Sequence, residues 1–348
     1  MKGQSVQSHR KDEHFFLAEK FFQEHAGAGF DQVRFIRSAL PGVRTDQVDL
    51  STKVAGLPMQ LPFFINAMTG GSPATGKVNA ALGKVAADFG LAIASGSESI
   101  LAHEPDQATT FSALRTANPE GLVFANVGAD KSPAIAQHAV ETLHANALEV
   151  HLNAPQELVM PEGERDFNWH ANIAAIVAAS QVPVIAKEVG FGMRADDFAV
   201  LTNLGVAAID VGGRGGTNFV KIENVRRPEG DYSELTNFGQ TTVESLMEAF
   251  GNTNLPIIAT GGVRTPLDVL KALRLGADAV GIAGLFLHWY TKDGADGLHT
   301  HVADFIEQLR GITALLGVRN IEELRDVPVV LNPELTNYVQ QRGLNFIN

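Results

Sequence analysis

The chain repeats one pattern eight times: a short apolar run, a turn signal and a segment with helical spacing. The apolar runs are rich in Val, Ile, Ala and Phe, and they occupy residues 61–70, 91–97, 121–128, 147–153, 182–189, 206–213, 255–262 and 277–284. Helical spacing is clearest at residues 76–89, 132–145, 168–180 and 265–275. Continuous apolar strands that alternate with helices indicate a parallel sheet covered on both faces.

Eight units of this kind predict a (β/α)8 TIM barrel with an N-terminal extension. A doubly wound open sheet is the alternative, although it rarely needs so many regular repeats without a reversal of the pattern. Before the first strand, we expect a basic start, an amphipathic helix around residues 13–25 and a β-like run at residues 31–43. After about residue 310, we expect a terminal helix and an ordered extension.

Composition excludes several classes of protein. A hydrophobic content of 45% and 34 glycines suit a compact α/β protein with many tight turns, and disorder would need far less hydrophobicity. The formal net charge of −12 argues against nucleic-acid and anionic-membrane partners, because both need a basic face. The chain has no cysteine, which excludes disulfides, thiolate zinc sites, iron–sulfur clusters and a cysteine nucleophile.

Neither the start of the chain nor its interior predicts a membrane segment. Residues 1–16 contain no apolar signal core, and no later stretch is long and apolar enough to span a bilayer. We therefore expect a cytoplasmic protein.

The apolar runs end in glycine or polar residues, and in a barrel these ends converge on the face where active sites are built. The stretch HLNAPQE, residues 151–157, is the clearest case, because polar groups so close to a buried strand are costly unless each has a partner. A generic polar turn is the alternative. Ordinary turns explain the glycines, but they do not explain Asn66, Thr69, Asn126, His151, Asn153 and Lys187. Residues 214–240 are too long for an ordinary βα loop and predict a lid or binding loop.

The last two strand ends predict a phosphate site. Loops after strands seven and eight, together with a helix N-terminus, often bind phosphate through backbone N–H groups. Gly261 and Gly262 allow a close approach of the backbone to an anion, and Arg264 can add charge. A second glycine-bearing end follows at residues 280–286.

Lys187 is expected to point inward, because a lysine at the end of strand five has no simple role in a core. A Schiff-base aldolase is one interpretation, since lysines at strand ends form such bases. The other strand ends favour a flat polar heterocycle, because they surround the axis with hydrogen-bonding groups from Ala67, Met68, Thr69, Ser97, Asn126 and Thr217. This combination suits flavin mononucleotide (FMN).

A set of motifs runs in order over nearly the whole chain: RKDEH (10–14), NAMTGG (66–71), HLNAPQE (151–157), PVIAKEVGFG (183–192), GRGGT (213–217), ATGGVR (259–264) and AVGIAG (279–284). As a set they resemble type 2 isopentenyl-diphosphate delta-isomerases. These are FMN-dependent TIM-barrel enzymes that interconvert isopentenyl and dimethylallyl diphosphate. GGVR alone occurs in many FMN barrels, whereas HLNxxQE together with an N-terminal RKxEH is much more specific.

The resemblance implies a role for each matching position. Residues 1–60 would form an N-terminal substrate-binding extension that leads into the barrel, and residues 61–348 would form the FMN-binding barrel, within one structural domain overall. The substrate would contact Arg10, Lys11, His151, Asn153 and Gln156, and Glu157 would hold Mg²⁺ on the diphosphate. FMN would contact Ala67, Met68, Thr69, Ser97, Asn126, Lys187, Gly212 and Thr217, with its phosphate at Gly261, Gly262, Arg264, Ala283 and Gly284. A homotetramer or homo-octamer is also implied.

The implied reaction adds a proton to an unactivated alkene and removes one from a neighbouring carbon. Such chemistry needs a strong acid and a dry cavity, and a chain without cysteine has no thiol to supply the proton. Our hypothesis is that reduced FMN is the acid–base catalyst, that NADPH serves as the reductant, and that Gln156 is the catalytic residue that positions or relays a proton.

Two other functions share parts of the pattern. An FMN-dependent oxidoreductase of the 2-hydroxy-acid oxidase type would need a histidine base after strand six, where this chain has GRGGT. A non-catalytic flavin- or phosphate-binding protein would not explain the density of polar strand ends. A nucleotide dehydrogenase that uses a catalytic cysteine is excluded.

Overall fold

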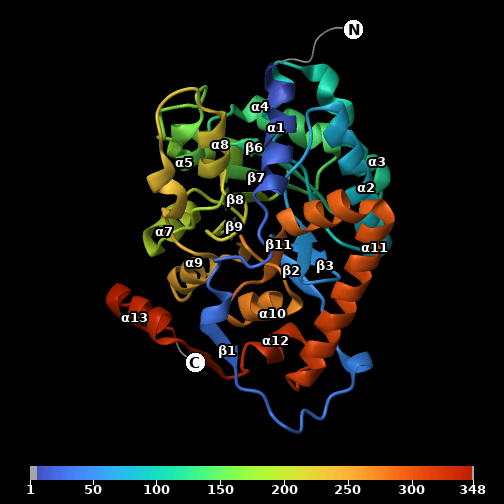
Figure 1. Ribbon diagram of the computed structural model, residues 1–348, viewed down its shortest axis with the longest axis vertical. Coiled ribbons are helices and arrows are strands. Elements are labelled where there is room, and N and C mark those ends of the chain that lie inside the picture. The colour runs from blue at the N-terminus through green and yellow to red at the C-terminus, as the bar shows by residue number, and fades with distance from the viewer. Residues whose placement is uncertain (1–5, 347–348) are drawn as a thin grey trace.

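A computed structural model describes residues 6–346 of the chain (Figure 1). Its centre is a closed barrel with the strand order β10-β11-β4-β5-β6-β7-β8-β9, and all neighbouring strands pair in parallel. The strands are β4 (Phe63–Ile65), β5 (Ile93–Ala94), β6 (Val123–Gly128), β7 (Ala147–Leu152), β8 (Val184–Glu188), β9 (Ala208–Asp210), β10 (Ile257–Thr260) and β11 (Ala279–Ile282). Each lies within one of the predicted apolar runs, so the predicted (β/α)8 barrel is confirmed and the open sheet was wrong.

Helices surround the barrel: α2 (Pro73–Phe89), α3 (Ala108–Ala117), α4 (Pro133–Leu143), α6 (His170–Ala179), α7 (Ala195–Asn203), α9 (Thr242–Ala249), α10 (Pro266–Arg274) and α11 (Gly284–Leu315). Local sequence sets their ends. Ser72 caps α2 by accepting a hydrogen bond from the backbone N–H of Thr75, and Gly90 ends the helix in the left-handed conformation. Helix α11 is kinked at Gly294 (φ 70°, ψ −167°), so its first turns form a short helix that starts directly after β11.

The barrel interior changes character along its axis. Its lower part is an apolar cluster that includes Phe64, Phe124, Ile185 and Ile258, and the hairpin of β2 (Thr52–Val54) and β3 (Leu57–Met59) packs against it. Farther along the strands, the interior positions are polar: Asn66, Asn126, Glu149, Lys187, Asp210 and Thr260. Apolar packing therefore fills one end of the barrel, and polar groups collect at the carboxyl ends of the strands.

The N-terminal extension differs from its predicted form. The helix expected at residues 13–25 is α1 (Val6–Lys20), which begins earlier and ends before Gly27 and Gly29. The prediction was wrong because polar residues such as Arg10 and His14 meet their carboxylate partners only in the folded protein. Helix α1 lies across the carboxyl-terminal face of the barrel and contacts α2, α11 and α8 (Phe219–Arg226) (Figure 1).

The ends of the chain also meet each other. Strand β1 (Val33–Phe35), within the predicted β-like run, pairs antiparallel with β12 (Val329–Leu331). Helices α12 (Ile321–Leu324) and α13 (Pro333–Arg342) complete the predicted C-terminal extension. Glu248 anchors α13, because its carboxylate accepts hydrogen bonds from Tyr338 (2.7 Å) and Arg342 (2.6 Å).

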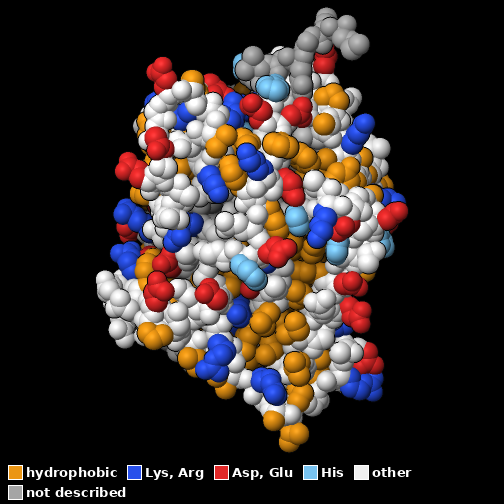
Figure 2. Space-filling model, viewed as in Figure 1, with side chains coloured by type: hydrophobic (Ala, Val, Ile, Leu, Met, Phe, Trp, Pro, Cys, Tyr) orange, Lys and Arg blue, Asp and Glu red, His pale blue; other side chains and the backbone are white. Residues whose placement is uncertain are grey.

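The molecular surface mixes charged residues of both signs, and hydrophobic side chains gather over α10 in the lower middle of the view (Figure 2). Leu267 of α10 is one of the exposed large hydrophobic residues of the protein. Exposed apolar surface of this kind is typical of an interface, although the homo-oligomer stays a prediction. None of the helices in residues 6–346 is long and apolar enough to cross a membrane.

Candidate active site

A cavity of about 620 Å³ opens at the carboxyl ends of the strands. Its wall includes every residue that the sequence predicted for a site. These are Arg10, Lys11, Ala67, Met68, Thr69, Ser97, Asn126, His151, Asn153, Gln156, Glu157, Lys187, Gly212, Thr217, Gly261, Gly262, Arg264, Ala283 and Gly284. The barrel therefore brings together residues from the N-terminal extension and from all eight strand ends.

Two buried carboxylates that sequence reasoning missed, Glu149 and Asp210, lie beneath the cavity and accept hydrogen bonds from the lining residues Asn126 and Thr260. Asp210 accepts hydrogen bonds from Asn66 (2.9 Å) and Thr260 (2.8 Å). Burial raises the pKa of Asp210, and the nearby Lys187 charge opposes that rise. An acidic residue inside an otherwise apolar strand, as in ALEV and AAID, was the signal that could have revealed both residues.

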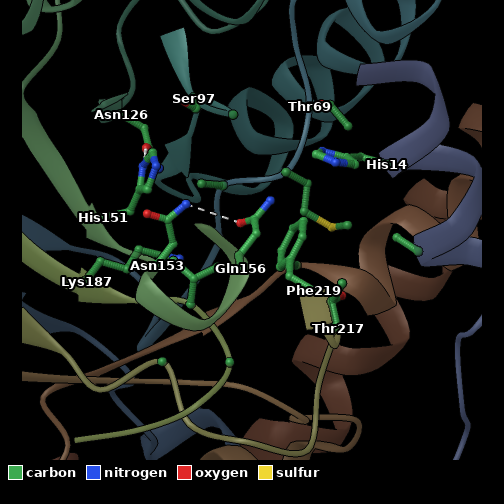
Figure 3. Close-up of a pocket in the computed structure, with 18 of the residues that line it drawn as sticks. His14, Thr69, Ser97, Asn126, His151, Asn153, Gln156, Lys187, Thr217 and Phe219 are labelled. Carbon is green, nitrogen blue, oxygen red and sulfur yellow. Dashed lines mark hydrogen bonds between the residues drawn. The ribbon is translucent and has the colours of Figure 1, made fainter. Parts of the chain in front are cut away.

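A hydrogen-bonded row links Glu149 to His151. Asn126 Nδ2 donates to Glu149 Oε2 at 2.9 Å. Asn126 Oδ1 lies 2.7 Å from His151 Nδ1, and these two side chains are drawn in Figure 3. Burial raises the pKa of Glu149 to about 8, and the Lys187 charge works against that rise. Burial and the charge of Lys187 lower the pKa of His151 to about 3, so this imidazole is neutral.

Glycine at the phosphate end lets three loops pack backbone against backbone. A Cβ on Gly212 would lie 1.9 Å from the Glu188 carbonyl oxygen, and a Cβ on Gly261 would lie 2.0 Å from the Gly213 carbonyl oxygen. Both residues also have positive φ, 45° for Gly212 and 113° for Gly261. The N-terminus of α11 at Gly284 borders the same space. Close backbone and a helix N-terminus are the features that bind phosphate, so these residues fit the phosphate of FMN.

Arg264 lies at the phosphate end of the cavity, and its side chain also interacts with the N-terminal extension. Its Nε donates to the Gln23 carbonyl oxygen at 2.9 Å, and the guanidinium lies 4.6 Å from the centroid of the Phe22 ring. Burial lowers the pKa of Arg264 to about 10. The residue therefore joins the N-terminal extension to the phosphate end and leaves a positive charge at the cavity wall.

Helix α5 (Ala154–Val159), directly after β7, carries Gln156 and Glu157, and Asn153 precedes it at the N-cap position. Asn153 Nδ2 donates to Gln156 Oε1 at 3.3 Å and to Glu157 Oε1 at 2.9 Å (Figure 3). Glu157 Oε2 accepts from the backbone N–H of Glu164 at 2.8 Å. Asn153 therefore holds Gln156 and Glu157 at fixed positions on the cavity wall.

The lid region, residues 214–240, contains α8 and a short 3-10 helix at Ser233–Asn237. Polar contacts fasten α1 to α8. Arg226 Nε forms an ion pair with Glu13 Oε2 at 2.9 Å, and His14 Nε2 lies 2.8 Å from Glu223 Oε1, although burial lowers the pKa of His14. Gln156 Nε2 donates to Glu223 Oε1 at 3.0 Å, and the rings of His14 and Phe219 pack edge to face at 5.7 Å. Sequence reasoning missed Glu223, His14 and Phe219, because no local pattern places α1 beside α8.

The two basic residues of the extension reach the cavity in different ways. Arg10 Nη1 lies 3.3 Å from Glu162 Oε1, so its charge is shared with a half-exposed carboxylate. Lys11 Nζ donates to the Ser97 carbonyl oxygen at 2.8 Å. Burial, and secondly the charge of Arg10, lower the pKa of Lys11 to about 7.

Within residues 6–346, no group of three or more His, Asp or Glu residues is placed to hold a metal ion. Among the described residues, Glu157 is one of five carboxylates at the cavity wall, the others being Asp130, Glu162, Glu164 and Glu188. Mg²⁺ commonly binds one or two carboxylates together with phosphate oxygens and waters. The residues therefore fit a Mg²⁺ ion that a phosphorylated ligand helps to coordinate, and they do not fit an all-protein metal cage.

Curated proteins are similar in sequence to this chain over almost their full length. An isopentenyl-diphosphate delta-isomerase of Lacticaseibacillus casei (strain BL23) is 55% identical over 98% of this chain and 98% of its own. The chain belongs to the isopentenyl-diphosphate delta-isomerase family. Family members from Latilactobacillus sakei subsp. sakei (strain 23K) and Staphylococcus haemolyticus (strain JCSC1435) are 50% and 46% identical, over 98% and 97% of this chain and of their own chains.

This isomerase family uses a barrel that flavin enzymes share. A profile of the FMN-dependent dehydrogenases matches residues 123–330. A solved mandelate oxidase variant with a monooxide FMN adduct has a TM-score of 0.62 and 17% sequence identity, over 92% of both chains. A mandelate oxidase with benzoyl-formic acid gives 0.63 and 16%, over 94% of this chain and 98% of its own. At this identity the likeness shows the fold alone. The predicted family is confirmed by the isomerases.

Proposed function

We propose that this chain interconverts isopentenyl diphosphate and dimethylallyl diphosphate by a 1,3-proton shift, with reduced FMN and Mg²⁺. One observation supports this function best. A single cavity has a glycine-rich phosphate end and a polar floor, and the Gln156–Glu223 hydrogen bond fixes a side chain of its wall. The 55% identity to an isopentenyl-diphosphate delta-isomerase gives the substrate class.

FMN would lie along the strand ends. Ala67, Met68 and Thr69 would border its ring, and Lys187 would approach the ring from the floor. Its phosphate would lie against the backbone at Gly261, Gly262 and Gly284, beside Arg264; the other contacts would come from Ser97, Asn126, Gly212, Thr217 and Ala283. When bound in its reduced form, FMN supplies the acid–base chemistry that a chain without cysteine lacks.

The diphosphate would lie between the N-terminal extension and α5. A substrate with roughly three negative charges needs local compensation in an acidic protein. Arg10 and Lys11 provide positive charge from α1, and Glu157 would hold Mg²⁺ on the phosphate oxygens. His151 and Asn153 line the same end of the cavity.

Gln156 would position or relay a proton at the hydrocarbon part of the substrate. Its Nε2 donates to Glu223 and its Oε1 accepts from Asn153, so both ends of the amide are fixed. Glu223 is fully buried, and hydrogen bonds from His14 and Gln156 together with the Arg226 charge hold its pKa below the usual range against the effect of burial. The chain thus keeps a fixed amide and an ionised carboxylate where a carbon-bound proton would move.

A 2-hydroxy-acid oxidase is the second candidate, because the mandelate oxidases share the fold. Against it, the loop after β9 reads GRGGT and contains no histidine to remove a proton from a hydroxy acid. One experiment separates the two functions. Purified protein should be yellow, and it should isomerise isopentenyl diphosphate only with Mg²⁺ and after reduction by NADPH or dithionite. Oxygen consumption with a 2-hydroxy acid, and no isomerisation, would reject the proposal in favour of an oxidase.

A further inference from the structure

Asn126 and His151 line the cavity as proposed contacts of FMN and of the substrate, whereas Glu149, to which Asn126 is hydrogen-bonded, has no part in the function proposed above. The row Glu149–Asn126–His151 lies where β6 and β7 pair, since Asn126 is the register partner of Glu149 and His151 follows two residues later on the same face. Glu149 is fully buried, and its Oε1 has no hydrogen-bond partner, whereas its Oε2 accepts from Asn126. Burying a carboxylate costs free energy unless hydrogen bonds or opposite charges compensate for the lost water. Within the part of the chain that the structure describes, Glu149 accepts only one side-chain hydrogen bond, so its presence here needs a physical reason.

We propose that Glu149 is a positioning residue that, through the Asn126 amide, holds the His151 ring in the tautomer with its hydrogen on Nδ1 and with Nε2 unprotonated. A carboxylate only accepts hydrogen bonds, so it fixes the NH2 group of Asn126 toward Glu149. The amide oxygen of Asn126 then faces His151 Nδ1 at 2.7 Å, and that nitrogen must donate. The tautomer of a histidine is set by the hydrogen bond that its other nitrogen makes.

In this tautomer the ring of His151 is neutral, and its Nε2 can accept a hydrogen bond from a ligand in the cavity. His151 lines the cavity, and its Nε2 lies 3.3 Å from the position that a Cβ on Gly128 would take. The low pKa of His151 agrees with this, because burial and the charges of Lys187, Lys11 and Lys131 all oppose a second proton. Charge compensation of a diphosphate therefore falls to Arg10, Lys11 and the metal.

Protonated Glu149 would no longer fix the orientation of the Asn126 amide. A carboxylic acid both donates and accepts, so either orientation of the Asn126 amide then satisfies it. Burial raises the pKa of Glu149 to about 8, with Lys187 of β8 lowering it and Asp210 of β9 raising it. Glu98, whose Oε1 lies 3.3 Å from the backbone nitrogen of Asn126, and Lys11 of α1 are the other charged groups nearby. As the pH falls below about 8, the single His151 tautomer should give way to a mixture.

The test is ¹⁵N NMR of the FMN-loaded protein labelled on its 11 histidines, in which protonated and unprotonated ring nitrogens have different shifts. The His151 signals are those that disappear in His151→Gln, or those that move in Asn126→Asp if the first variant does not fold. Above pH 8.5, wild type should show one His151 tautomer, with the hydrogen on Nδ1. Glu149→Gln should show both tautomers, since a glutamine satisfies either amide orientation.

Two further variants separate orientation from charge. The exchange Glu149→Gln/Asn126→Asp places a carboxylate directly against His151 Nδ1, so it should restore the single Nδ1–H tautomer. Asp210→Asn removes a different carboxylate near Lys187 and leaves the hydrogen bond between Asn126 and Glu149 in place, so it should leave the His151 signals unchanged. A wild-type ring with its hydrogen on Nε2, or a Glu149→Gln variant that keeps one tautomer, overturns the proposal.

The tautomer proposal depends on the proposed function only for the identity of the ligand that contacts His151. The tautomer is observed without turnover, so failure to isomerise the diphosphate would not affect the result.

Discussion

Gln156 and Glu223 are 67 positions apart in the sequence, yet Gln156 Nε2 donates a 3.0 Å hydrogen bond to Glu223 Oε1, which is buried behind the cavity wall. The bond joins the helix after β7 to the lid region after β9. Glu223 also meets His14 of the N-terminal extension. One buried carboxylate therefore connects three segments that surround the expected substrate, and it fixes the amide for which the sequence predicts a role in proton transfer.

Shortening Gln156 should remove this role. In Gln156→Asn the amide retreats by one methylene group from Glu223, so kcat should fall by roughly 10²–10⁴-fold, the range of a lost acid–base contribution. The visible flavin spectrum should be unchanged, since Gln156 is not an expected FMN contact. Gln137→Asn, the same change on the outer helix α4, is the matched control and should keep wild-type turnover. Normal kcat in Gln156→Asn would remove this residue from the mechanism.

Lys11 should give substrate capture a pH dependence. Its pKa is lowered to about 7, so in the free enzyme its charge is present below pH 7 and is lost as the pH rises. We expect kcat/KM to fall between pH 7 and 9 while kcat changes less, because bound diphosphate keeps the ammonium protonated. Arginine stays charged over this range, so Lys11→Arg should lack the alkaline fall. An identical pH profile for both proteins would assign the fall to another group.

Glu157 should make turnover dependent on Mg²⁺. A chelator should stop isomerisation and leave FMN bound, and added Mg²⁺ should restore the rate. Glu157→Gln should raise the Mg²⁺ concentration needed for half-maximal rate by about tenfold or more, because it removes the one protein charge proposed for the ion. Glu141→Gln, at an exposed position of α4, is the matched control. Equal Mg²⁺ dependence in both variants would place the ion elsewhere.

The glycine of the phosphate end should resist substitution. In Gly261→Ala the new Cβ would lie 2.0 Å from the Gly213 carbonyl oxygen, at a φ of 113° that costs about 1–2 kcal/mol for a residue with a side chain. The variant should unfold at lower temperature and lose FMN during gel filtration. Gly311→Ala, in α11 with nothing within 4 Å of the new Cβ, should instead be more stable by about 1 kcal/mol. Retention of FMN by Gly261→Ala at wild-type stability would contradict the assignment.

The repeat of apolar runs and helical segments was enough to predict the barrel. A parallel strand that is buried on both faces must be continuously apolar, and this requirement is local and visible in sequence. The strand-end residues followed from the same reasoning, because a barrel places all carboxyl ends on one face. Asn126, His151, Lys187 and Gly261 all lie on the cavity wall for this reason.

Only the tertiary structure decided how those residues are paired. Nothing local in the sequence places Asn126 between Glu149 and His151, or His14 and Gln156 on the same carboxylate of Glu223. The bounds of α1 were wrong for a related reason, since its polar residues are stable in a helix only where Glu162 and Glu223 meet them. Burial and neighbouring charge also set the pKa of Lys11 and Glu149, and both depend on segments distant in the chain. Apolar periodicity is a property of each segment by itself, whereas hydrogen bonds and electrostatics within the cavity depend on which segments the fold brings together.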